Sequence, residues 1–369
     1  MGWLAPRIGV VTLYRVGLLL TGVILVVYGL LVYVENHTAF LASSMTLRAV
    51  EGVGTAAVLT GVRSIIINQF PQRMNSAMSL VEGMYGAGSC LGPALGGAMY
   101  SIGGYGAPFY ALGTLSVANA AISLLLMPAV TEHQADSPEN DGQGPNYRDS
   151  LLFALSNADS WLILAASCSV AVNWNGIDNS LAPYALDTLN MELPELSLFF
   201  MGSFAGFGLS SLLWGRLSDS IDNTFVLEAG CLALVALGIL LIPPSPLLGL
   251  LPSRLLLGVG MTLREVFQMG VNLPLLPLLV RLLVSRGMPD DIRSHALLTS
   301  LCGFTFAAGN ALGPMLGGLV TDFWGFPVLA TWLSGITALL SVMMAARALV
   351  YHLSRRTAPA HCKAYVTLA

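Results

Sequence analysis

Ten long apolar stretches dominate this sequence of 369 residues. They cover roughly residues 11–33, 40–68, 76–101, 107–128, 159–186, 195–214, 224–243, 250–283, 295–321 and 326–350. An apolar helix of about 18 residues or more can cross the hydrocarbon core of a bilayer. Only 10% of the residues are charged, against roughly 25% in soluble domains. The sequence therefore predicts an all-α membrane protein with about ten transmembrane helices.

Short loops join these stretches, with one exception at residues 129–158. The segment TEHQADSPENDGQGPNYRDS is acidic and has too few apolar residues to pack. We interpret it as a solvated linker between an N-terminal lobe (1–128) and a C-terminal lobe (159–350), followed by a tail (351–369). A phosphorylation or docking segment is the alternative. Thirteen of the sixteen arginine and lysine residues fall at alternate loops or at the chain ends, which predicts that both termini and the linker are cytoplasmic.

Three short patterns occur twice, in the same order. GWLAPRIG (2–9) matches GRLSDSID (215–222), RAVEGVG (48–54) matches RLLLGVG (254–260), and GSCLGPALGG (88–97) matches GNALGPMLGG (309–318). Ordered repetition of this kind is typical of transporters built from duplicated halves.

These patterns resemble the shared motifs of the major facilitator superfamily. The three family motifs are the turn GxLaDrxG, the Arg-x-x-x-Gly-x-Gly motif and GPxxGG. The resemblance implies a fold of two pseudo-symmetric lobes, with residues 1–128 as family helices 3 to 6 and 159–350 as helices 7 to 12. GPxxGG looks like the signature of the antiporters. NGIDNSLAPYALD (175–187) and SLVEGMYGAGSCLGPALGG (79–97) are most similar to the vesicular amine transporters, in particular the polyamine branch.

The chain departs from the family pattern at its N-terminal end. Family helices 1 and 2 would precede residue 1, so we expect a fragment or incomplete form of a transporter. Pro6 stands where the turn usually has Asp, whereas the second copy keeps Asp219. The resemblance assigns a conformational turn to Gly2, Arg7, Gly215 and Asp219.

The doubled GPxxGG stretch predicts two smooth helix faces. Its residues are Gly88, Gly92, Pro93 and Gly96 in the first copy and Gly309, Gly313, Pro314 and Gly317 in the second. Glycines spaced by four leave a face without side chains, on which another helix can approach closely, and proline bends the helix. We expect the two faces to meet between the lobes and to serve gating. Ordinary packing of small residues is the alternative.

Seven charged residues stand out inside the apolar stretches, where a charge costs about 2.5–3.5 kcal/mol unless it faces a wet cavity or a partner. They are Arg48, Glu51, Glu82, Asp178, Arg254, Arg264 and Glu265. The repeats share Arg48 and Arg254, but Glu51 aligns with Leu257 and Glu82 with Gly303. The two copies should share what the scaffold needs and differ where solute binds, which favours a functional role for the acids.

Helical spacing groups candidate residues for solute binding. Arg254, Gly258, Met261, Glu265, Gln268 and Asn272 form one stripe that should line a cavity. Asn175, Asp178 and Asn179 share a second face before Pro183. We predict that the solute is bound by Asp178, Asn175, Asn179, Glu265 and Tyr184. Two alternatives remain open: Asp178 is a structural acid paired with an arginine, and Glu265 forms an ion pair with Arg264.

Glu82 is the best candidate for a proton carrier, because an apolar helix favours the neutral form of a carboxyl group. A protonated structural Glu is the alternative. Glu51, Arg48 and Arg254 are predicted to take part in proton coupling. Tyr85, Tyr184, Trp174 and Phe267 offer aromatic faces for a cation.

The sequence therefore predicts a secondary transporter that exchanges protons for an organic cation, with a polyamine or monoamine favoured. Its expected partners are that solute, protons and the bilayer, with no nucleic acid, and we expect a monomer in a vesicular or other intracellular membrane. There is no GxxxxGK[ST] pattern and no cluster of metal ligands, so no cofactor, metal site or enzyme activity is expected. A facilitator of another organic solute and a non-transporting interaction protein are the alternatives.

Overall fold

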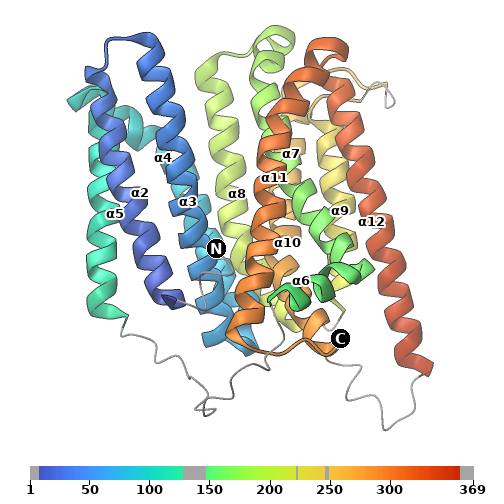
Figure 1. Cartoon of the computed structure of the whole chain (residues 1–369). Helices are drawn as coiled ribbons and strands as arrows, with labels where there is room; N and C mark the ends of the chain where they lie inside the picture. The colour runs from blue at the N-terminus through green and yellow to red at the C-terminus, as the bar shows by residue number, and fades with distance from the viewer. Residues whose placement is uncertain (1–7, 128–146, 222, 246–248, 358–369) are drawn as a thin grey trace. The chain divides into compact units, whose positions relative to one another are not determined.

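The computed structural model describes residues 8–127, 147–221, 223–245 and 249–357 (Figure 1). Regular structure in these ranges is helical throughout. Each of the ten predicted apolar stretches coincides with one long helix. The largest differences are at the C-terminal ends of α8 and α12, which continue to Ser220 and Thr357. The predicted all-α fold class is confirmed.

The helices form two compact units, and the first is built around α2. This unit contains the described parts of residues 1–69, 92–151 and 290–303. Its elements are α2 (Val10–Gly29), η1 (Leu30–Tyr33), α3 (His37–Gln69), α5 (Gly106–Leu126), the end of α4 (Met74–Gly103) and the start of α11 (Ile292–Trp324). Both α3 and α5 pack against α2 (Figure 1). A Cβ at Gly17 would lie 2.8 Å from the carbonyl oxygen of Gly54, so glycine permits the close approach of α2 and α3.

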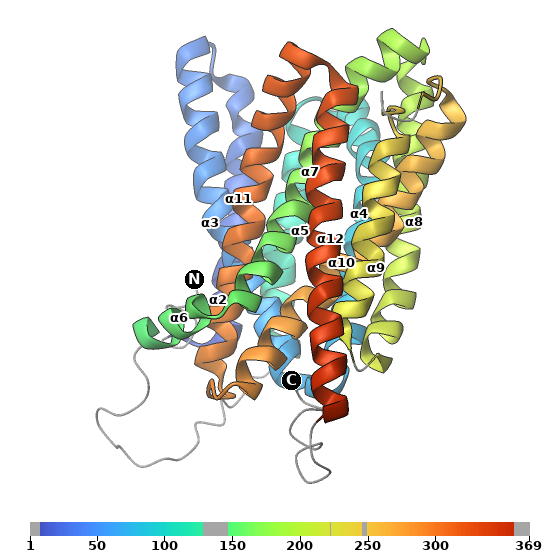
Figure 2. The same ribbon diagram turned by 90° about the vertical axis from the view of Figure 1, so that its right-hand side faces the viewer.

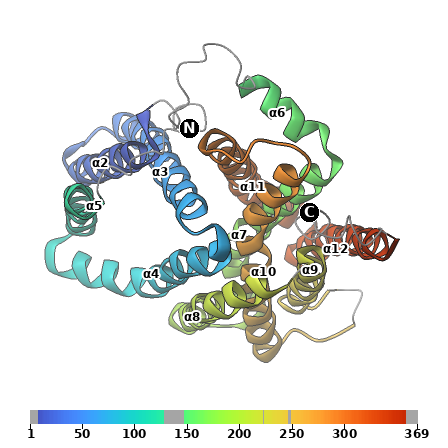
Figure 3. The same ribbon diagram turned by 90° about the horizontal axis from the view of Figure 1, so that it is seen from below.

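The second unit contains the described parts of residues 70–91, 152–289 and 304–369. Its elements are η2 (Pro71–Arg73), α7 (Ala158–Leu189), α8 (Leu193–Ser220), α9 (Thr224–Leu241), α10 (Arg254–Ser285), α12 (Phe326–Thr357), the start of α4 and most of α11. Helix α9 packs against α10 and α12, and α10 also packs against α7 and α8 (Figure 3). Helix α10 thus contacts three neighbouring helices of this unit. Its buried residues include the polar Arg264, Glu265 and Gln268.

Local sequence explains where these helices begin and end. The Ser253 side chain accepts a hydrogen bond from the backbone N–H of Leu256 at 3.2 Å and so caps α10. Helix α7 ends at Asn190, whose φ of 46° is left-handed, a conformation that Asn tolerates better than most residues. Gly104 and Gly325 have φ of 69° and 85°, and they separate α4 from α5 and α11 from α12.

One helix was missed by the sequence analysis. Helix α6 (Tyr147–Ser156) lies within the predicted linker and meets α7 at a bend of 87° (Figure 2). Its sequence ends in LLFALS, which has enough apolar residues to form a helix. This helix was missed because the acidic composition was considered over the whole linker. The rest of the linker that precedes α6 lies outside the described residues.

Fewer of the described helices are long and apolar enough to span a membrane than the ten spans that were predicted. Among the described residues, eight helices are long and apolar enough to cross a membrane, and the bent pair of α6 and α7 makes a ninth. Helix α4 is not one of them, because it is rich in glycine and serine and contains Glu82. The division into an N-terminal and a C-terminal lobe stays a prediction, since α4 and α11 each contribute to both units.

Candidate functional site

Three charged side chains meet between α7 and α10. The Arg264 guanidinium donates from Nη2 to Asp178 Oδ1 at 2.5 Å and also to Glu265 Oε1. The Arg264 and Glu265 side chains are each 1% exposed and that of Asp178 is 21% exposed. Buried charges are stable only when they are paired. The ion pairing that the sequence left open for both acids is therefore present.

An aromatic cluster adjoins the buried carboxylate of Glu265. The indole N–H of Trp174 donates to both oxygens of Glu265, at 3.0 Å each. The Trp174 ring centroid lies 6.4 Å from that of Tyr85, 5.2 Å from that of Phe207 and 6.4 Å from that of Phe306. These rings come from α4, α7, α8 and α11, all within the second unit. The arrangement places π faces, which attract cations, beside an acid.

Amide side chains extend the polar surface of α7. Asn175 Nδ2 donates to Asn310 Oδ1 of α11 at 2.8 Å, and Asn179 Nδ2 donates to the backbone oxygen of Asn175 at 2.8 Å. On α10, Gln268 Nε2 donates to the backbone oxygen of Val170 at 3.1 Å. The predicted polar stripe of α10 is therefore buried against α7 at Glu265 and Gln268 rather than lining an open cavity.

Three residues of this site were missed by the sequence analysis: Phe207, Phe306 and Asn310. Aromatic residues inside apolar stretches gave no signal that distinguished Phe207 and Phe306. Asn310 could have been found, because it stands in the repeated GPxxGG stretch where the first copy has Ser89. A polar difference between duplicated copies is the signal that singled out the acids.

Other predicted residues lie outside the cluster. In the second unit, the Tyr184 ring packs on Phe326 at a centroid distance of 5.1 Å, and Arg254 donates to Glu195 at 2.9 Å near the start of α10. In the first unit, Arg48 donates to Glu51 at 2.7 Å, and its guanidinium lies 4.6 Å from the Tyr28 ring centroid. Their roles in solute binding and proton coupling stay predictions.

Glu82 lies on α4, one turn before Tyr85, and its side chain is half-buried. Tyr85 is within electrostatic reach of Glu82, Glu265 and Asp178. The Tyr85 ring also neighbours Trp174, which donates to Glu265.

The glycine face of α11 is occupied by α7. A Cβ at Gly309 would meet the backbone of Cys168, one at Gly313 would lie 3.0 Å from the Asn175 Cβ, and one at Gly317 would lie 2.9 Å from the Gly176 oxygen. At Gly88, Gly92 and Gly96 a Cβ would meet no described atom within 4 Å. The α11 glycines thus pack on α7, and the expectation that the two glycine faces meet for gating stays a prediction. Pro314 lies inside α11, and the Pro93 side chain lies outside the described residues.

Substitution on this face should disrupt the site. We expect Gly313→Leu to destabilise the protein by about 1–3 kcal/mol or more, because the new side chain overpacks the contact between α11 and α7. Gly318→Leu is the matched control on the same helix, since a Cβ there meets no described atom within 4 Å. Thermal unfolding of both purified variants measures the difference. Equal unfolding temperatures of the two variants would show that the contact at Gly313 accommodates a larger side chain, which would contradict this prediction.

Gly215 and Asp219, the residues of the second predicted turn, lie at the end of α8 and contact α4. The Asp219 carboxylate accepts hydrogen bonds from the backbone N–H groups of Asn75 and Ser76 at 3.3 and 2.9 Å, at the start of α4, and Arg281 lies 3.9 Å away. A Cβ at Gly215 would clash with Ser79 of α4. An anionic side chain at a helix N-terminus is stabilising, so this turn ties α8 to α4. Gly2 and Arg7, the predicted residues of the first turn, lie outside the described residues.

Comparison with known proteins identifies the family. The model of the Major Facilitator Superfamily matches residues 1–297. The chain belongs to the major facilitator superfamily. The resemblance stated from the repeated motifs is confirmed.

Relatives within the superfamily are transporters. The human MFS-type transporter SLC18B1 is 26% identical over 344 residues, 91% of this chain and 71% of that protein. The bovine synaptic vesicular amine transporter is 22% identical over 348 residues, 92% of this chain and 62% of that protein. The chain is thus a multi-pass membrane transporter related to the vesicular amine transporters.

Solved structures show the same fold. The E. coli fucose:proton symporter FucP aligns with a TM-score of 0.70 at 14% identity, covering 94% of this chain and 86% of that one. The human organic anion transporter MFSD10 (TETRAN) aligns with a TM-score of 0.65 at 15% identity, covering 91% and 82%. One fold therefore carries solutes of different charge, so the solute must be inferred from the site.

Proposed function

We propose that this transporter exchanges protons for an organic cation, with a polyamine or a monoamine favoured, by alternating access. The cluster of Asp178, Arg264 and Glu265 carries the proposal. Two carboxylates and one guanidinium leave one negative charge when all three are ionised. Either a proton or the ammonium group of a solute can balance that charge, and the two compete. Competition of this kind couples release of one to binding of the other.

The surroundings of the cluster support a cationic solute. Trp174 and its three aromatic neighbours can contribute about 0.5–2 kcal/mol each to an ammonium group that lies over a ring. Asn310 Oδ1 accepts one hydrogen bond from Asn175, and a carbonyl oxygen has a second lone pair for an N–H of the solute. An organic anion would instead meet the net negative charge of the cluster.

A transport assay tests this proposal. The purified chain in proteoliposomes with an acidic interior should accumulate a labelled polyamine or a labelled aromatic monoamine. Accumulation should collapse when an ionophore dissipates the pH gradient, because proton efflux drives it. Uptake that is independent of the gradient would instead support a facilitator of another organic solute. A folded chain without uptake would support a non-transporting interaction protein.

The proposal extends to cellular location. Because the relatives include synaptic vesicular amine transporters, we place this transporter in a vesicular or other intracellular membrane, with both termini in the cytoplasm. Protease protection of terminal tags in isolated vesicles measures this orientation, and a protected tag would contradict it.

A further inference from the structure

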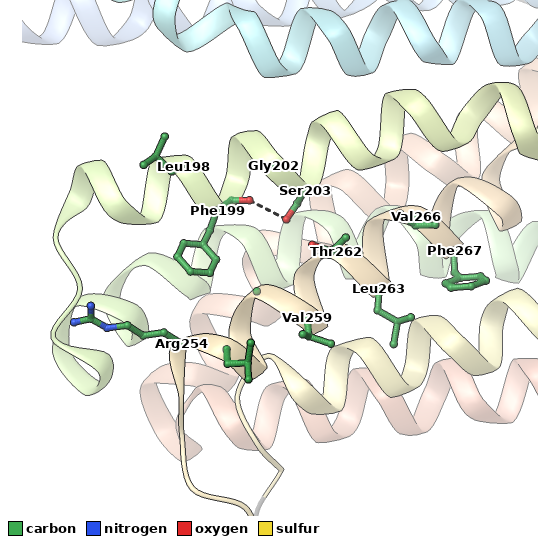
Figure 4. Close-up of a pocket in the computed structure, with 12 residues that line it drawn as sticks. Leu198, Phe199, Gly202, Ser203, Arg254, Val259, Thr262, Leu263, Val266 and Phe267 are labelled. Carbon is green, nitrogen blue, oxygen red and sulfur yellow. Dashed lines mark hydrogen bonds between the residues drawn. The ribbon is translucent and has the colours of Figure 1, made fainter.

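An elongated apolar groove of about 920 Å³ runs between α8 and α10 in the second unit. Figure 4 shows the Arg254 side chain at one end and Phe267 near the other. Phe199 and Gly202 of α8 form one wall, and Val259 of α10 lies on the opposite wall. Apart from Arg254, Ser203 and Thr262, the lining is apolar.

Two leucines of the apolar lining are strongly exposed. Leu198 is 61% exposed and Leu255 is 76% exposed, and both lie on helices that are long and apolar enough to span a bilayer. Ser203 donates to the Phe199 oxygen of its own helix at 2.9 Å. The Ser203 hydroxyl is thus satisfied within α8, and the mainly apolar lining matches an apolar chain supplied by the bilayer.

Its length matches one leaflet. Residues 254 to 267 of α10 correspond to about 20 Å of helix at a rise of 1.5 Å per residue. Half of the hydrocarbon core is about 15 Å thick. The groove is thus long enough to hold one acyl chain from the polar boundary to the middle of the bilayer.

Arg254 stands where the headgroup of such a lipid would lie. Its guanidinium donates to Glu195 at 2.9 Å and to the Asn190 oxygen at 3.0 Å, next to the end of α7. The side chain is still 51% exposed, so part of the guanidinium can reach a further anion. Guanidinium groups pair with phosphate through two parallel hydrogen bonds.

We propose that this groove binds a membrane phospholipid, with one acyl chain between α8 and α10 and the phosphate on Arg254. The lipid phosphate would compete with Glu195 and the end of α7 for the same guanidinium. Helix α10 also carries Arg264 and Glu265, so the lipid would lie against a helix that contributes two members of the charged cluster. The site is independent of which solute is transported.

Photolabelling tests the proposal on the whole chain in nanodiscs. The probes are a phosphatidylglycerol with a photoreactive diazirine in one acyl chain and a diacylglycerol with the same chain but no phosphate. Mass spectrometry of the labelled peptides should locate the phospholipid label mainly on α8 and α10 along the groove. Arg254→Gln should reduce the preference for the phosphate-bearing probe about tenfold, since a hydrogen bond to a charged group contributes on that order.

Two substitutions that fill the groove give the controlled comparison. Gly202→Leu should reduce the label severalfold without a clash, because a Cβ there meets no described atom within 4 Å. Val259→Trp fills the groove from α10 and should act in the same way. Gly335→Leu on α12 is the matched control, also without an atom within 4 Å, and should leave the label unchanged. An even distribution of label over all lipid-facing helices, or an unchanged groove label in both folded filling variants, would overturn the proposal and indicate annular lipid only.

Discussion

Replacement of Arg264 with methionine should lower the free energy of unfolding by about 3–5 kcal/mol, the cost of leaving a buried charge without its partner. Arg264 is the cation that both Asp178 and Glu265 contact, and its side chain is 1% exposed. Methionine replaces the apolar stem but removes the guanidinium. Thermal or denaturant unfolding of the purified protein in detergent measures the loss.

A companion variant separates charge from packing. In Arg264→Met combined with Asp178→Asn and Glu265→Gln, every member of the cluster is neutral. Neutral replacement of a whole buried cluster is often without net cost, so the triple variant should regain most of the lost stability. If the triple variant is as unstable as Arg264→Met alone, packing around the side chain rather than charge compensation explains the loss.

The sequence predicted that these charges need partners but could not identify them. A charge in an apolar helix implies a partner or a wet cavity, which correctly singled out Asp178, Arg264 and Glu265. Asp178 and Arg264 are 86 positions apart, and their contact depends on how α7 and α10 pack. Helix boundaries followed from local composition, whereas contacts between helices required the fold.

The duplicated glycine stretches show the same limit in another form. Two nearly identical sequences predicted two equivalent faces, yet Gly313 packs on α7 while a Cβ at Gly92 would meet no described atom within 4 Å. A repeat determines which side chains a helix face carries. The helix that packs on that face comes from another part of the chain, so the repeat alone could not predict which helix it is.

Composition averaged over a segment also conceals local structure. Residues 129–158 were interpreted as one acidic linker, but the last part forms α6. The prolines and all the acidic residues except Asp149 lie before it, and the apolar LLFAL lies within it. A shorter window would have distinguished the two parts.

Glu82→Gln and Asp178→Asn should have different effects on transport if one acid carries the proton and the other binds the solute. The neutral amide of Gln mimics a protonated carboxyl group. If Glu82 delivers the proton that competes with the solute at the cluster, Glu82→Gln should abolish accumulation driven by a pH gradient while retaining gradient-independent exchange of labelled for unlabelled solute. Both activities can be measured in the same proteoliposomes.

Asp178→Asn should instead weaken binding of the cation itself by at least about thirtyfold, since loss of one partner of a buried charge pair costs about 2 kcal/mol or more. In that variant Arg264 and Glu265 balance each other, so no net negative charge remains for the solute. Equilibrium binding of the labelled cation measures this loss, and Glu82→Gln should leave that affinity nearly unchanged. Full pH-driven accumulation by Glu82→Gln would assign Glu82 a structural role and place the coupling at Asp178, Glu265 or Glu51.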